Sequence, residues 1–81
     1  MITSGQIRAA RALLDWTRSE LSEKSGIGIS ALMRFESADG VPAGNIKTID
    51  AVKKTFEDVG VEFIGSPDDR PGVRLNVSNK P

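Results

Sequence analysis

At 81 residues, the chain is long enough for one modest hydrophobic core and too short for two. Its 11 basic and 11 acidic side chains balance, so no net positive field draws the molecule onto a polyanion or an anionic membrane. Cysteine, histidine and tyrosine are absent, which removes disulfides, the usual zinc ligands and the commonest general base. We therefore expect a cytoplasmic, non-enzymatic protein with no catalytic residue, metal, cofactor, small-molecule ligand or membrane span.

Two successive segments carry the same helix-start pattern. Thr3 is followed three residues later by Gln6, and Thr17 is followed in the same way by Glu20. This spacing is the capping-box signature, in which each of the two side chains binds the other residue's backbone N–H. The pattern predicts two successive helices, and Gly26 provides the left-handed residue that ends the second one.

A third short helix is predicted after Gly28, close behind the second. Leu32 and Phe35 lie on one face of this helix. Leu21 of the second helix and Leu32 of the third fill the angle between the two helices, which meet at Gly26. This arrangement predicts a helix-turn-helix whose third helix is presented outward.

The remaining residues predict a fourth helix and a β-hairpin. Asn45 caps a strongly periodic segment that Gly60 ends, after which the apolar residues alternate as in strands, over 61–64 and 73–77 around a loop at 65–72. The apolar face of the fourth helix is predicted to contain Ile49, Val52, Phe56 and Val59. The predicted fold class is mainly α, with one domain over residues 1–81: a helical core at 3–60, a hairpin at 61–77 and a tail at 78–81.

In these helices the sequence resembles the XRE-like helix-turn-helix family, of the Cro and lambda-repressor type. The resemblance covers roughly residues 3 to 60 and implies a four-helix domain that binds operator DNA as a dimer, with its third helix in the major groove. It also implies a structural ion pair between Arg11 and Glu36. The residues that carry the resemblance are Ile7 to Arg11, Trp16-Thr17, Leu21, Gly26-Ile27 and Phe35-Glu36.

The same resemblance assigns candidate contact residues. It places Arg18 at a DNA phosphate, and Arg8 and Lys24 are further phosphate candidates whose alternative interpretation is as solvated surface charges. The pair Asp68-Asp69 is predicted to form a turn rather than a metal site. The residues placed on the outward face of the third helix are Gly28, Ile29, Ser30, Met33 and Arg34.

This outward face is poorly equipped to read bases. Of its side chains, only Arg34 has the forked donors that recognise a base edge, and residues 1–36 carry five basic and four acidic groups. Ile29 and Met33 instead form an apolar pair one helical turn apart, which is typical of a protein-docking helix. The alternatives are that the hairpin covers this pair or that it lies in a homodimer interface.

From these residues we predict a small transcriptional regulator that acts by protein contact. It would bind a transcriptional activator through the outward face and inhibit it, as an anti-activator. In size and pattern the chain resembles the small anti-activators that restrain quorum-sensing activators of conjugative-element transfer. The alternative function is that of an XRE-like repressor that binds operator DNA as a homodimer.

Overall fold

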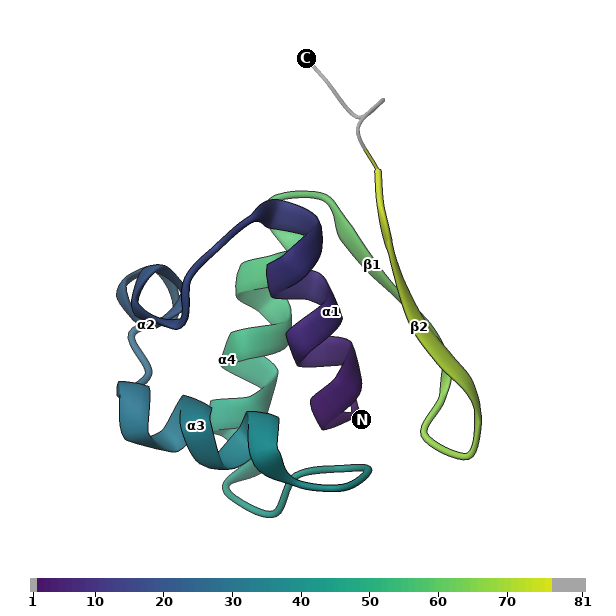
Figure 1. Cartoon of the computed structure of the whole chain (residues 1–81), viewed down its shortest axis with the longest axis horizontal. Helices are drawn as coiled ribbons and strands as arrows, with labels where there is room; N and C mark the ends of the chain where they lie inside the picture. The colour runs from purple at the N-terminus through teal and green to yellow at the C-terminus, as the bar shows by residue number, and fades with distance from the viewer. Residues whose placement is uncertain (1, 77–81) are drawn as a thin grey trace.

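The computed structural model describes residues 2–76 and contains four helices followed by an antiparallel two-stranded hairpin, as the sequence predicts (Figure 1). Val77 and the predicted tail at 78–81 lie outside the described residues. No helix in the described part is both long and apolar enough to cross a membrane. The elements are α1 (Ser4–Leu14), α2 (Arg18–Ser25), α3 (Ile29–Ser37), α4 (Ile46–Glu57), β1 (Val61–Ser66) and β2 (Asp69–Leu75).

Both predicted capping boxes are formed. The Thr3 hydroxyl accepts from the Gln6 backbone N–H at 3.0 Å, and the Gln6 side-chain oxygen accepts from the Thr3 N–H at 2.8 Å. Thr17 and Glu20 make the matching pair of bonds at the start of α2. Gly26 has a φ of +74° and ends α2 in the left-handed conformation, as predicted. Local sequence signals therefore set the start of both helices.

The hydrophobic core lies among the four helices and the inner face of the hairpin. Trp16, half-buried, stacks on Phe56 with ring centroids 5.7 Å apart, and Phe63 of β1 meets the same ring edge-on at 6.1 Å. The prediction that Val59 belongs to this core is wrong: α4 ends at Glu57, the chain turns, and Val59 is 45% exposed. The fully buried apolar residues are Ile2, Ile7, Ala10, Leu21, Leu32, Phe35, Ile49, Val52, Phe56 and Val61.

The hairpin is longer than predicted. Its strands pair Val61 with Leu75 and continue to Ser66 and from Asp69, so the predicted loop at 65–72 is wrong and only residues 67 and 68 form the turn. The pairing continues past a register shift between Ile64 and Ser66, where two residues of β2, 70 and 71, lie opposite the single residue 65 of β1. Gly65 has a φ of +76°, and a Cβ there would lie 2.2 Å from a backbone oxygen, so this position requires glycine.

Gln6 fastens the hairpin to α1. Its side-chain amide nitrogen donates to the backbone oxygens of Ile64 and Gly72, at 3.1 and 2.8 Å. Ile64 and Gly72 are cross-strand partners. Gly72 has no side chain, and the side chain of Ile64 is 39% exposed to solvent. At this point the backbone oxygens of the hairpin face α1 without a covering side chain, and the amide of Gln6 provides their hydrogen-bond donor. The hairpin thus packs within its own chain.

Candidate functional site

The outward surface of α3, which the sequence analysis identifies as a candidate contact surface, carries two exposed apolar side chains. Leu32, Phe35 and Glu36 turn inward and are buried. On the other side of the helix, Ile29 is 42% exposed and Met33 is 51% exposed. We call the surface formed by Gly28, Ile29, Ser30, Met33 and Arg34 the α3 face; all five residues are exposed.

The hairpin does not cover the α3 face. In Figure 1, α1 stands between the hairpin and α2, and α3 lies at the opposite end of the molecule from the start of β1. The alternative in which the hairpin buries Ile29 and Met33 is therefore wrong for the single chain. The two side chains remain available to another molecule.

The N-terminal end of the α3 face is open. Gly28 is the N-cap residue, and no side chain caps the helix there. A Cβ at Gly28 would meet no atom within 4 Å, and its φ of −60° suits any residue. Within residues 2–76, the backbone N–H groups of Ile29, Ser30 and Ala31 have no hydrogen-bond acceptor. Packing and backbone conformation within the chain therefore do not require glycine at position 28.

Behind the α3 face, three arginines converge on Glu36. Arg11 donates to both carboxylate oxygens through Nε and Nη2, each at 2.8 Å. Arg18 Nη2 donates to the same carboxylate at 3.3 Å, and Arg8 Nη1 donates to the backbone oxygen of Glu36. Glu36 is 3% exposed. This network, which we call the Glu36 cluster, ties together α1, α2 and α3.

The Glu36 cluster is ionic. Burial opposes ionisation of Glu36, but hydrogen bonds from Arg11 and Arg18, together with their charges, outweigh it and lower the pKa of the carboxyl group. The hydrogen bond to Glu36 in turn raises the pKa of Arg11. The carboxylate of Glu36 and the guanidinium group of Arg11 are therefore both charged at neutral pH, and each compensates the charge of the other.

The three candidate phosphate contacts all have partners inside the protein. Arg8 and Arg18 belong to the Glu36 cluster, and Lys24 Nζ lies 5.2 Å from the centre of the Trp16 ring. The resemblance led us to expect Arg11 beside Glu36, and the structure places them together at 2.8 Å. Sequence reasoning missed that Arg8 joins them, although Arg8 and Arg11 are three residues apart and share one face of α1.

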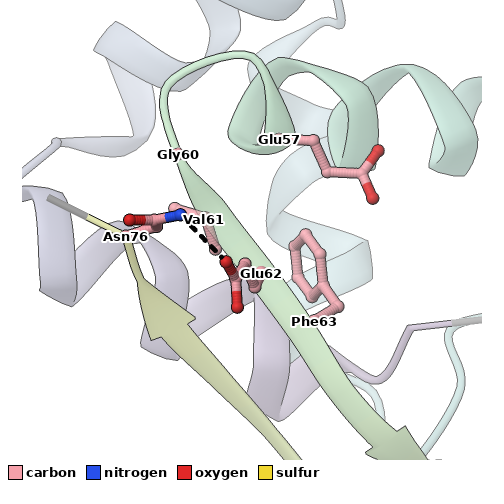
Figure 2. Close-up of a pocket in the computed structure, with 6 residues that line it drawn as sticks. All are labelled: Glu57, Gly60, Val61, Glu62, Phe63 and Asn76. Atoms are coloured by element: carbon pink, nitrogen blue, oxygen red, sulfur yellow. Dashed lines mark hydrogen bonds between the residues drawn. The ribbon is translucent and has the colours of Figure 1, made fainter. Parts of the chain in front are cut away.

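A surface hollow lies at the C-terminal end of α4. An open hollow of about 360 Å³ flanks β1, with Glu57 and Phe63 on one side of the strand and Glu62 on the other (Figure 2). Both carboxylates already have basic partners: Lys53 lies 4.0 Å from Glu57, and Arg74 lies 2.7 Å from Glu62. The acidic side chains that line the hollow, Glu57 and Glu62, are thus each beside a basic residue of the described chain.

No metal-binding cluster occurs in the part of the chain that the structure describes, which includes Asp68 and Asp69. Comparison of the sequence with models of protein families and with curated proteins finds no match.

Proposed function

We propose that this chain is a small helix-turn-helix transcriptional regulator that acts by protein contact, as an anti-activator whose α3 face binds and inhibits a transcriptional activator. The observation that supports this most is the exposure of Ile29 and Met33. By the resemblance to XRE-like proteins, these two residues correspond to positions at which that family carries base-reading side chains. The chain's resemblance to that family links the α3 face to the control of transcription.

The apolar character of the α3 face favours a protein partner. Ile29 and Met33 are each about half-exposed, so covering them removes roughly half of the apolar area whose full burial is worth about 1.5–3 kcal/mol per side chain. Neither side chain has a polar group to desolvate. Methionine also adapts to an irregular surface, because its side chain is unbranched and polarisable. Against base edges in a major groove, these two side chains offer little beyond contact with a thymine methyl group.

The charge distribution also favours protein over DNA. Affinity for DNA comes largely from basic side chains that displace counterions from phosphates. Among residues 2–37, Arg34 is the single basic side chain with no partner within the described residues 2–76. With Arg8, Arg11 and Arg18 directed toward Glu36, the surface that would meet a DNA backbone has few basic groups to offer.

A capture experiment with a matched control tests the proposal. Tagged wild-type protein should co-purify a transcriptional activator from its native host, and should repress a reporter gene that depends on that activator. Met33→Asp should abolish both effects, because it places a charge in the apolar contact. Ile46→Asp is the control: Ile46 is 59% exposed but lies on α4, so this variant should retain both. Equal loss in the two variants would contradict the proposal.

Operator binding as a homodimer is the second candidate, and the free Arg34 side chain favours it. If DNA is the target, the protein should shift a defined duplex at ordinary ionic strength, and the affinity should fall steeply with added salt. Arg34→Ala should then weaken the shift more than Lys47→Ala, which removes an exposed cation from α4. Tight, Arg34-dependent binding of this kind would overturn the anti-activator proposal.

A further inference from the structure

The chemistry of the segment that binds the α3 face follows from the positive groups at its two ends. This inference rests on the proposed function, since it describes the partner of the same surface. At one end lies the uncapped start of α3, and at the other lies Arg34. Between them is the apolar pair Ile29 and Met33.

The start of α3 attracts negative charge. Its first backbone N–H groups are unpaired in the described chain, and the helix dipole adds partial positive charge at the same place. Gly28 leaves room for close approach, because a side chain there would fill open space beside these N–H groups. An acidic side chain of a partner can therefore take the place of the missing N-cap.

The other end carries a formal charge. The Arg34 side chain is exposed and has no partner within residues 2–76. The one carboxylate on α3 belongs to Glu36, which is buried against Arg11 on the inner side of the helix. The nearest exposed carboxylate that follows in the sequence is Asp39, in the loop beyond α3. The whole exposed strip is therefore apolar and positive, with no negative side chain.

We propose that the α3 face binds an acidic amphipathic helix of the activator, in which apolar side chains one turn apart pack on Ile29 and Met33 and carboxylates meet Arg34 and the start of α3. Apolar anchors at helical spacing are what one helix presents to another. Carboxylates are favoured because Arg34 forms charge-assisted, bidentate bonds with them. A basic partner segment would meet the same positive groups and be repelled.

Selection from a displayed library tests this and does not require the activator to be identified first. The full-length protein is immobilised, and single-helix peptides with randomised surface positions are selected for binding, with Met33→Asp protein used to remove background binders. The selected helices should be enriched in Asp and Glu beside apolar residues at i and i+4. Synthetic versions should bind the wild type and lose about tenfold in affinity or more with Arg34→Glu.

Two further variants locate the charges. Gly28→Asp should also weaken binding of the synthetic peptides, because its carboxylate would occupy the start of α3 itself. Lys47→Glu is the control and should leave the affinity within about twofold of wild type, since Lys47 lies on α4. Circular dichroism on each variant establishes that the helices remain folded.

The remaining outcomes separate the two proposals. Enrichment of basic helices, or Met33-dependent binding that Arg34→Glu does not weaken, would overturn the acidic-partner inference while leaving the proposed function standing. Failure to select any helix whose binding depends on Met33 would count against both. Selection of helices that copy α3 of this chain would show that a second copy is the occupant, and would also overturn the inference.

Discussion

Glu36 links three helices through its side chain and its backbone oxygen. Its carboxylate is almost completely buried and holds guanidinium groups from α1 and α2, while its backbone oxygen accepts from Arg8. A buried ion pair adds little net stability compared with an apolar replacement of both partners, but removing one partner leaves an uncompensated charge. Removing one member of the Glu36 cluster should therefore destabilise the fold, although the intact cluster adds little net stability.

Glu36→Gln should lower the free energy of unfolding by about 1.5–3 kcal/mol, because Arg11 and Arg18, which are partly exposed, lose their charged acceptor. Urea unfolding followed by circular dichroism measures this loss. Glu62→Gln is the matched control, since it breaks an exposed pair with Arg74 and should cost less than about 1 kcal/mol. Similar losses in the two variants would contradict the structural role assigned to Glu36.

Gln6→Glu tests the link between α1 and the hairpin. The new carboxylate still accepts from the Thr3 N–H, so the capping box survives, but it cannot donate to the oxygens of Ile64 and Gly72. We expect a loss of about 2 kcal/mol in urea unfolding, because two acceptors lose their donor and face a negative charge. Glu20→Gln makes the reverse exchange in the exposed capping box of α2, and it should change the free energy of unfolding far less than Gln6→Glu does.

Helix α3 is the one described helix whose N-terminus has no side-chain cap. Gly28 is only a fair N-cap, and no side chain replaces it. Gly28→Asp should therefore raise the free energy of unfolding by about 0.5–1 kcal/mol, through an N-cap hydrogen bond and the helix dipole. Urea unfolding measures the gain. A destabilised variant would mean that the start of α3 is less open than its surroundings indicate.

The helices were predictable because their signals are local. Thr3, Thr17 and Gly26 act on neighbours within five positions. The spacing of Leu32 and Phe35 predicts which side of α3 is buried, and the opposite side is then predicted to be exposed. The extent of the hairpin was not predictable, because it depends on a register shift in which Arg70 and Pro71 of β2 lie opposite the single residue Gly65, within a stretch whose Gly, Pro and Asp residues are typical of a loop. The helix pattern of residues 49–59 likewise did not reveal that α4 stops two residues before Val59.

The contacts of the arginines were the other part that sequence could not supply. Arg18 follows an N-cap and resembles a phosphate ligand, and nothing nearby in the chain indicates that Glu36, 18 residues away, binds it. The same holds for Gln6, whose amide bonds reach residues 58 and 66 positions further along. Long-range pairing of polar groups has no periodic signature, so only the folded arrangement reveals it.

At the scale of the whole molecule, the distribution of titratable groups sets how stability depends on pH. The chain has no histidine, and the pKa values of Glu36 and Glu20 are lowered in the folded state. Between the lowered pKa and the ordinary glutamate value of about 4.3, the unfolded chain binds more protons than the folded one. Stability is therefore present in full above that value and is lost as the pH falls through the lowered pKa.

We expect the free energy of unfolding to be nearly constant from about pH 6 to 8 and to fall as the pH drops below about 5. Urea unfolding across this pH range measures the profile. In Glu36→Gln the decline should be shallower, because one of the protons that drives unfolding has no site to bind. An equally steep decline in the variant would mean that Glu36 contributes nothing to acid unfolding.

The two capping boxes have a consequence for the order of folding. Each closes over three residues, so it can form in the unfolded chain at small entropic cost and nucleate its helix early. The attachment of the hairpin instead waits until the amide of Gln6 meets a strand some 60 residues downstream, as its two bonds at separations of 58 and 66 require. Helices α1 and α2 should thus start to form first, and the hairpin should attach to α1 later.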